Sequence, residues 1–189
     1  MLEKRFNYSE IEKSCILDWS KNDVFKFKYE LENQPFCIMM PPPNVTGSLH
    51  MGHALTFTLQ DILIRFNKKL GKNVLWQPGI DHAGIATEII VEKNILEKKQ
   101  IKKHDLGREK FLEQIWEWKS KSGDKIIEQL TRIGSSIDWS ISRFTMDEGL
   151  SKSVNSVFIN LFEKGLIYKD KILVNWDPNL ETAVSDLEV

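Results

Sequence analysis

The most regular pattern of apolar positions lies between residues 55 and 70. The apolar side chains of this segment are Leu55, Leu59, Ile62, Leu63, Phe66 and Leu70. The steps between them are three, four or one residues, which is the 3.6-residue period of a helix with one apolar face. Because Gly71 follows, the helix is predicted to stop there.

A different pattern, an uninterrupted apolar run, precedes this helix at residues 36–40. Such a run is typical of a strand that is buried on both faces. Pro41, Pro42 and Pro43 follow the run and stop both a strand ladder and a helix. The pattern therefore predicts a strand, a tight loop and then the long helix.

The rest of the chain predicts further helices and short strands. A strand at 73–76 follows the long helix, and a strand, a crossover helix and a second strand are the unit of a parallel sheet. Ser9 and Glu12 form a capping-box pattern that opens a helix ending near Lys21. The other predicted elements are a polar linker at 28–34, helices at 85–98, 106–133 and 147–165, and strands at 166–168 and 172–176.

His50 and His53 lie at the start of the predicted long helix, where free backbone N–H groups and the helix dipole attract anions. Their i, i+3 spacing places both imidazoles on one side of the helix. Gly52 between them carries no side chain that would keep a flat ligand away from the backbone. The alternative is that these histidines only cap the helix or face solvent. A pair of histidines around a glycine favours a ligand site.

Parallel sheets bind ligands at the carboxyl ends of their strands. Asp81 lies in the loop at 77–84, directly after the second predicted strand. We therefore expect Asp81 to face the same crevice as His50 and His53 and to offer a carboxylate to a cation such as the ammonium of an amino acid. The alternative is that Asp81 caps the helix predicted at 85–98.

Composition limits the size of the domain, the kind of partner and the cellular compartment that we expect for the protein. The chain has 189 residues, 41% hydrophobic and 28% charged, which suits one domain or part of a larger protein. A net charge of -1 gives no overall attraction to nucleic acid. Cys15 and Cys37 fit neither a disulfide framework nor a four-ligand zinc site, which predicts a reduced, cytoplasmic setting. Residues 1–6 include charges where a signal peptide needs an apolar core, and no apolar run is long enough to span a membrane.

Two further segments have both a structural and a nucleic-acid interpretation. The segment at 97–110 is rich in Lys and Arg, a composition that usually forms a solvated helix face and in some proteins contacts RNA. The helix predicted at 106–133 carries an aromatic stripe that includes Trp116 and Trp118. We expect this stripe to pack in the core rather than to stack on bases.

Longer motifs give the chain a family resemblance. His-x-Gly-His at 50–53 resembles the nucleotide-binding signature shared by class I aminoacyl-tRNA synthetases and small nucleotidylyltransferases. The full string Pro-Pro-Pro-Asn-Val-Thr-Gly-Ser-Leu-His-Met-Gly-His at 41–53 resembles the valyl branch of the synthetases. The other matching motifs are Gly-Ile-Asp-His-Ala-Gly-Ile-Ala-Thr at 79–87, Asp-Leu-Gly-Arg-Glu at 105–109, Trp-Glu-Trp-Lys at 116–119, Phe-Thr-Met-Asp-Glu-Gly-Leu-Ser at 144–151 and Val-Asn-Trp-Asp-Pro at 174–178. Ile80 departs from the threonine expected before the aspartate.

The resemblance covers essentially the whole chain and implies an α/β fold. It implies a Rossmann-like parallel sheet with flanking helices, forming the first half of a class I synthetase catalytic domain. Residues 1–35 would be an N-terminal helical extension, 36–178 the half domain, and 179–189 a junction toward an editing insertion. Synthetases of this branch are several times longer, so the editing insertion, the Lys-Met-Ser-Lys-Ser loop and the anticodon-binding domain would lie outside this chain.

The activity implied is the ATP-dependent activation of valine to valyl-adenylate and its transfer to tRNA(Val). Editing of mischarged threonine would occur in the part outside this chain, and the fragment alone would be inactive. The resemblance assigns catalysis to His50 and His53. It assigns ATP binding to Gly47, His50, Gly52 and His53, and amino-acid binding to Pro42, Asn44 and Asp81.

The implied partners are ATP, valine and tRNA(Val). Mg²⁺ would accompany ATP as part of the substrate complex, without a protein-bound metal. The full-length protein is expected to be a cytoplasmic monomer without a membrane partner.

Two other classes of protein compete with this interpretation. A small nucleotidylyltransferase shares His-x-Gly-His but has no use for an ammonium-binding Asp81 or for the long helices after it. A non-catalytic, synthetase-like module would bind a partner or tRNA without chemistry. Valine-dependent pyrophosphate exchange separates the first from a synthetase, and the reading frame after Val189 tests the second.

Overall fold

The computed structural model describes residues 7–28, 32–179 and 181–185. The N-terminal segment 1–6, part of the linker predicted at 28–34, and the end of the predicted junction at 186–189 lie outside the described residues. The chain divides into two compact units, Met1–Asp147 and Glu148–Val189.

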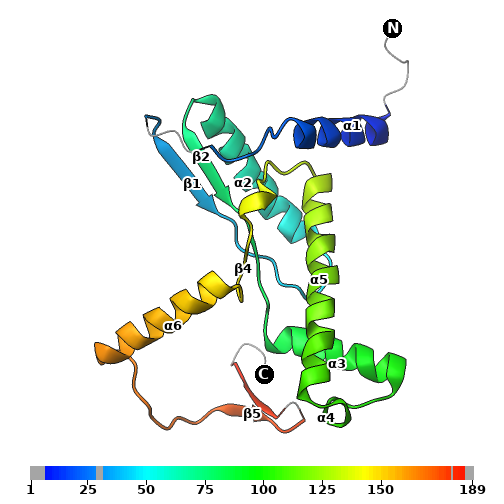
Figure 1. Ribbon diagram of the computed structural model, residues 1–189, viewed down its shortest axis with the longest axis vertical. Helices are drawn as coiled ribbons and strands as arrows, with labels where there is room; N and C mark the ends of the chain where they lie inside the picture. The colour runs from blue at the N-terminus through cyan, green and yellow to red at the C-terminus, as the bar shows by residue number, and fades with distance from the viewer. Residues whose placement is uncertain (1–6, 29–31, 180, 186–189) are drawn as a thin grey trace. The chain divides into compact units, whose positions relative to one another are not determined.

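The first unit is built on a β-α-β motif, as predicted. Strands β1 (Pro35–Met39) and β2 (Asn73–Gln77) pair in parallel, with Pro35 opposite Asn73 and Met39 opposite Gln77. Helix α2 (Met51–Lys69) connects them and lies beside the strand pair (Figure 1). The carboxyl ends of both strands therefore point to the same edge, where the two candidate loops begin.

The three prolines interrupt this ladder, but the two segments that follow β1 and β2 stay side by side. Proline has no backbone N–H to donate, so the last regular bond runs from Met40 N to Gln77 O, at 3.0 Å. Pairing resumes at an isolated parallel bridge between Asn44 and Asp81. There, Asp81 N donates to Pro43 O at 2.9 Å and Val45 N donates to Asp81 O at 3.0 Å. The two candidate loops are thus joined through their backbones.

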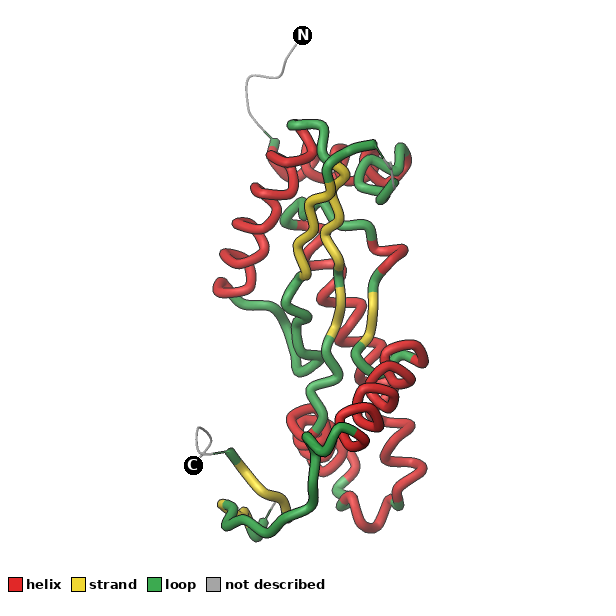
Figure 2. Tube along the Cα trace, turned by 90° about the vertical axis from the view of Figure 1, so that its left-hand side faces the viewer, coloured by secondary structure: helices red, strands yellow, loops and turns green. Residues whose placement is uncertain are grey.

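A second parallel pair extends the arrangement beyond the prolines. Strand β3 (Gly79–Ile80) pairs with β4 (Arg143–Phe144), and Figure 2 shows the two strand pairs one above the other with helices beside them. The described residues thus form mixed helix and sheet with short parallel pairs. A single continuous Rossmann-like sheet is not formed within them.

The prediction that the strand at 36–40 is buried on both faces is wrong. Burial alternates along β1, with Cys37 exposed and Met39 75% exposed. Only the face that carries Phe36 and Ile38 meets the core. The core contains Met40, Phe57, Ile64, Trp76, Ile126, Leu130 and Ile137.

Helix α2 forms where it was predicted, but its predicted apolar face does not pack. Leu55, Leu59, Ile62, Leu63, Phe66 and Leu70, which we call the outer face of α2, are all between 49% and 63% exposed. The buried face instead carries Phe57, Ile64 and Asn67. Asn67 tolerates burial because its side-chain amide donates to Leu63 O at 2.8 Å.

The remaining helices of this unit differ from prediction mainly at their ends. Helix α1 (Tyr8–Lys21) begins after Asn7, so the predicted capping box at Ser9 does not form. Helix α3 (Ile85–Lys99) agrees closely. The long helix predicted at 106–133 is α5 (Arg108–Arg132), and Gly107, which adopts φ +79°, separates it from a short preceding helix, α4 (Lys103–Leu106). A short 3-10 helix, η1 (Trp139–Ile141), follows.

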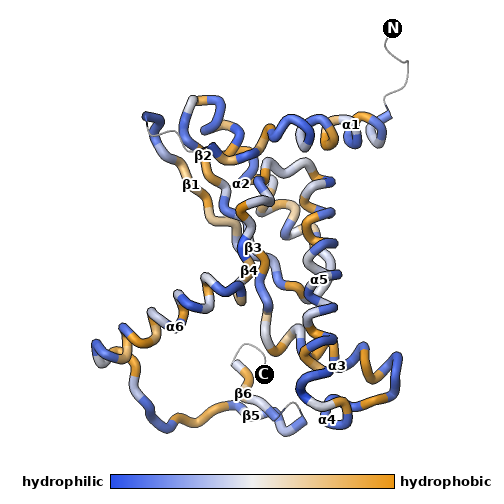
Figure 3. The backbone as a smooth tube through the Cα atoms, viewed as in Figure 1, coloured by the Kyte–Doolittle hydropathy of each residue, from blue (hydrophilic) through white to orange (hydrophobic). Residues whose placement is uncertain are grey.

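The second unit contains helix α6 (Glu148–Glu163) and an antiparallel pair, β5 (Asn175–Asp177) with β6 (Thr182–Val184). Apolar and polar residues alternate along α6 (Figure 3). The strand predicted at 166–168 is a loop. Of the strand predicted at 172–176, residues 172–174 are also a loop, in which Leu173 is 99% exposed, and the last two residues lie in β5. A β-branched run forms a strand only when a partner accepts its backbone bonds, and here the ladder begins at Asn175.

Candidate active site

Most of the predicted site residues line one cavity of about 760 Å³ at the start of α2. Those in its wall are Pro42, Asn44, Gly47, His50, Gly52 and His53. Asp81 does not line this cavity, but its backbone is bridged to Asn44. The structure therefore brings the proline loop and the two histidines together, with Asp81 attached to the same loop.

The two histidines cap α2 with one nitrogen each. His50 Nδ1 accepts from Gly52 N at 3.1 Å, and His53 Nδ1 accepts from His50 N at 3.3 Å. A nitrogen that accepts carries no proton, so in each neutral ring the hydrogen is on Nε2. Neither Nε2 has a hydrogen-bond partner within the described part of the chain. Both histidines can therefore cap the helix and still donate to a ligand.

The charge state of His53 suits a neutral donor. Burial lowers the pKa of His53 below its usual value of 6.5, and the neighbouring His50 lowers it further. The ring centroids of the two histidines are 4.0 Å apart, so a proton on one disfavours a proton on the other. His53 is therefore neutral at pH 7 and presents Nε2–H.

The position of the His50 ring requires a glycine at position 52. A Cβ at this position would lie 2.9 Å from His50 Cε1 and 3.0 Å from His50 Nδ1. The sequence interpretation gave Gly52 the role of admitting a flat ligand, whereas the geometry also shows that it admits the His50 ring. Gly47, by contrast, has no atom within 4 Å of an added Cβ among the described residues.

Helix α5 holds the proline loop at two points that the sequence interpretation missed. Trp118 Nε1 donates to Val45 O at 2.7 Å. Gln129 Oε1 accepts from Leu49 N at 2.9 Å. Trp118 also packs in a small core with Val91, Ile95 and Phe111 of α3 and α5, as expected for the aromatic stripe, whereas Trp116 of the same stripe is 48% exposed. Each of these two bonds depends on one polar atom of one side chain, and a single polar atom produces no periodic pattern in a sequence.

Asp81 uses one carboxylate oxygen for its own loop. Its Oδ1 accepts from Ala83 N at 2.7 Å, in a turn where Ala83 has φ +55°. The N-cap of α3 is Gly84, without a side-chain cap bond, so the alternative that Asp81 caps this helix is wrong. Ile80, which replaces the expected threonine, is buried and accepts a backbone bond from Thr145 N at 3.1 Å.

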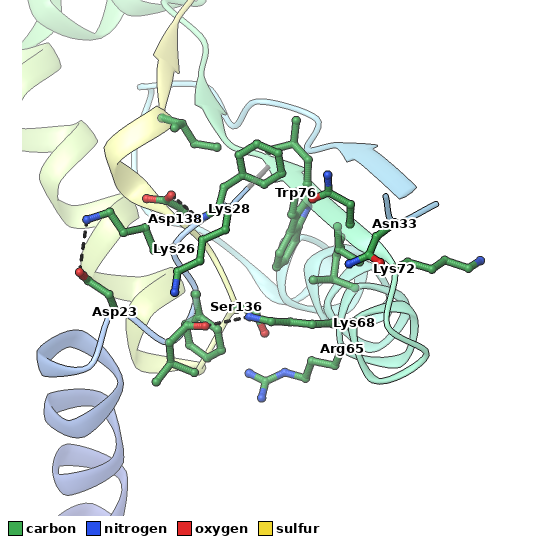
Figure 4. Close-up of a pocket in the computed structure, with 18 of the residues that line it drawn as sticks. Asp23, Lys26, Lys28, Asn33, Arg65, Lys68, Lys72, Trp76, Ser136 and Asp138 are labelled. Carbon is green, nitrogen blue, oxygen red and sulfur yellow. Dashed lines mark hydrogen bonds and ion pairs between the residues drawn. The ribbon is translucent and has the colours of Figure 1, made fainter. Parts of the chain in front are cut away.

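A second cavity of about 440 Å³ has several basic side chains in its wall. Figure 4 shows that several of these side chains already have protein partners: Lys26 contacts Asp23 at 3.2 Å and Lys68 donates to Val24 O at 2.8 Å. Arg65 pairs with Asp61 at 2.7 Å. The wall, as far as it is described, contains none of the predicted site residues.

Among the described residues, no group of three His, Cys, Asp or Glu is placed to hold a metal ion. None of the described helices is long and apolar enough to cross a bilayer. The basic segment at 97–110 is partly paired, since Lys103 contacts Glu88 at 3.0 Å and lies over the ring of Phe111.

The family model described as "tRNA synthetases class I (I, L, M and V)" matches residues 14–189. The chain therefore belongs to this family. This match runs through the helices after Asp81, which the small-nucleotidylyltransferase alternative left unexplained.

Within the family, the most similar relatives found share one name. The chain is 59% identical over 191 residues to the valine–tRNA ligase of Mesorhizobium japonicum and 57% identical over 191 residues to that of Bradyrhizobium diazoefficiens. A third relative, the valine–tRNA ligase of Bartonella quintana, is 56% identical over 191 residues. In each case the whole chain is covered, but it spans only 20 to 21% of the relative's length.

A solved structure supports the fold independently. The chain superimposes on Agrobacterium radiobacter K84 agnB2 LeuRS, solved as a ternary complex with tRNA and LeuAMS, with a TM-score of 0.77. The two share 21% sequence identity, and the match covers 96% of this chain and 21% of that one. The pieces of parallel sheet seen here thus form part of a class I synthetase fold.

Proposed function

We propose that the full-length protein is a valine–tRNA ligase that activates valine with ATP and transfers it to tRNA(Val). The observation that carries the proposal is the 59% identity to a valine–tRNA ligase along the whole chain. It is supported by the six predicted site residues that share one cavity. In this proposal, editing of mischarged threonine belongs to the part of the protein outside residues 1–189.

His50 and His53 contribute hydrogen-bond donors to the first step. The carboxylate of valine attacks the α-phosphorus of ATP, and pyrophosphate leaves. Negative charge then builds on phosphate oxygens, where fixed donors stabilise it. The free Nε2–H groups of the two rings supply such donors beside the N-terminus of α2, whose dipole adds to them. Gly47 and Gly52 keep the cavity open for the nucleotide, which brings Mg²⁺ as its own counterion.

Pro42, Asn44 and Asp81 contribute the amino-acid end of the site. Asp81 provides the carboxylate for the ammonium of valine, since its Oδ2 has no hydrogen-bond partner within the described residues. Asn44 lies opposite Asp81 across the bridge and is exposed, so its amide is available to place the ligand. Pro42 forms one wall of the side-chain pocket.

The experiment that tests this assignment is the substitution Asp81→Asn in the full-length protein. It keeps the shape of the side chain and removes its charge. We expect valine affinity to fall by about 2 to 4 kcal/mol, because a partly desolvated ion pair is lost, while ATP affinity is unchanged. Calorimetry with each ligand measures both values. Asp124→Asn, at an exposed aspartate of α5, is the matched control, and equal losses for valine and ATP would assign the effect of Asp81→Asn to damaged folding.

A second prediction concerns Gly52→Ala. Alanine favours a helix over glycine by about 1 kcal/mol, but its Cβ would displace the His50 ring from its bond with Gly52 N. We expect pyrophosphate exchange to slow by about tenfold or more, while the free energy of unfolding changes by less than about 1 kcal/mol. The control is Gly123→Ala in α5, where the added Cβ meets only Ile80 Cδ1 at 3.7 Å. Full exchange by Gly52→Ala would remove His50 from the mechanism.

The alternative of a non-catalytic module predicts a different outcome for the same assay. Such a protein binds its partner but shows no valine-dependent exchange at any length. Valine-dependent exchange by the full-length protein, absent with isoleucine or leucine at equal concentration, supports the ligase. Absence of exchange in a folded, full-length protein would favour the module.

A further inference from the structure

A threonine outside the predicted site lies against the Asp81 carboxylate. Thr145 Oγ1 is 2.6 Å from His82 Nδ1 and 3.4 Å from Asp81 Oδ1. It also accepts from His82 N at 2.9 Å. One hydroxyl therefore contacts both side chains of the Asp81–His82 pair, and no role was assigned to it from the sequence.

The charges around this hydroxyl determine where its proton points. The hydroxyl has one hydrogen, and the negative Asp81 Oδ1 is the stronger acceptor for it. His82 then carries its proton on Nδ1 and donates to Thr145 Oγ1, which accepts a second bond from His82 N. In this arrangement each of the three contacts of the hydroxyl joins a donor to an acceptor. Direct contact between His82 Nδ1 and Asp81 Oδ1 is longer, at 3.5 Å.

The backbone fixes Thr145 independently of its side chain. Strand β4 pairs with β3, and Thr145 N donates to Ile80 O at 3.1 Å just past that pair. On the other side, Arg143 and Asp147 form a two-bond ion pair, both bonds at 2.7 Å. The hydroxyl is thus presented to Asp81 from a segment more than 60 residues away in sequence.

We propose that Thr145 is a positioning residue of the amino-acid site. Together with Ala83 N, its hydroxyl occupies Oδ1 of Asp81 and so fixes the rotation of the carboxylate. Oδ2 is left as the oxygen that receives the ammonium of the amino acid. His82 supports this by directing the hydroxyl proton toward Asp81. The inference rests on the proposed function, in which Asp81 binds that ammonium.

The test uses the full-length protein and the variant Thr145→Val, which keeps the shape of threonine but lacks the hydroxyl. We expect the KM for valine in pyrophosphate exchange to rise about tenfold, as for loss of one hydrogen bond to a charged group. The KM for ATP should stay unchanged and kcat should change by less than about threefold. Thr145→Ser keeps the hydroxyl and should restore the KM. Thr58→Val, at an exposed threonine of α2, is the matched control.

Two inhibitors separate an effect on the ammonium from a general loss of structure. Valinol keeps the ammonium, and 3-methylbutanoate keeps the carboxylate and side chain without it. Thr145→Val should weaken valinol about as much as valine and leave 3-methylbutanoate unchanged. Equal weakening of both would overturn the proposal. If Thr145→Val does not fold, Thr145→Ala provides a second variant without the hydroxyl for the same comparison.

A double-mutant cycle separates this inference from the function on which it rests. If Thr145 acts through Asp81, Thr145→Val should have less than a twofold effect on the valine KM when Asp81 is already Asn. Independent, multiplying effects would overturn the positioning role and leave the Asp81 assignment intact, as would an unchanged KM for Thr145→Val alone. An unchanged valine affinity for Asp81→Asn alone would overturn the proposed ammonium site and this inference with it.

Discussion

Replacing His53 by alanine in the full-length protein should slow valyl-adenylate formation about 10² to 10³-fold, with little change in valine affinity. The size is that of removing one donor from developing oxyanion charge, and valine is spared because Asp81, Asn44 and Pro42 are not altered. Pyrophosphate exchange measures the rate, and calorimetry measures valine affinity. A His53→Ala protein within twofold of the wild-type rate would reduce His53 to a helix cap.

Two further variants separate the two nitrogens of His53. The amide oxygen of Asn lies close to where Nδ1 lies, so His53→Asn keeps an acceptor for His50 N but loses the Nε2 donor. His53→Gln places an amide N–H near Nε2 and loses the cap. If catalysis depends on the Nε2 donor, His53→Gln should retain more exchange than His53→Asn. The opposite order would mean that capping α2 is the main contribution of this residue.

Residues 1–189 expressed alone should associate and show less than a few per cent of the full-length exchange rate. The reason is the outer face of α2, which exposes a row of large apolar side chains, together with the exposed face of β1. Contiguous apolar surface and an open sheet edge favour association in water. Sedimentation and valine-dependent exchange, run beside the full-length protein, measure the two outcomes.

A substitution shows whether the outer face of α2 is the cause. Phe66→Lys should make the 1–189 fragment more monomeric, because it breaks the apolar surface, without restoring exchange. Leu17→Lys, at a 70% exposed position of α1, is the matched control. A monomeric, fully active fragment without substitutions would show that this surface needs no covering and that residues 1–189 suffice for the first step.

The sequence predicts α2 well but not the side on which it packs. Its apolar period is real, yet the buried side chains are Phe57 and Ile64, which lie outside the most regular stripe. A helix with apolar residues on two sides satisfies the same pattern whichever side meets the core. Periodicity predicts that such a helix forms, and the neighbouring elements decide which of its faces is buried.

The candidate site was predictable as far as it is contiguous in sequence. The proline loop and the two histidines fall within 41–53 and line one cavity. Trp118, Gln129 and Thr145 could not be found this way, because each acts through one polar atom across 60 or more residues. The motif that includes Thr145 was recognised by resemblance, but a motif alone does not say which atom its hydroxyl meets.

The bridge between Asn44 and Asp81 lets the loop keep its geometry while the selectivity of the amino-acid site changes. Their spacing is set by bonds among Pro43, Val45 and Asp81 that use only main-chain atoms, so no side chain at 44 or 81 is needed to maintain it. A new side chain at position 44 can therefore be tried in evolution without loss of the bridge, while Asp81, whose carboxylate also accepts from Ala83 N, is kept. A lineage built on this frame can change the amino acid that it selects while keeping the nucleotide chemistry of the adjoining helix.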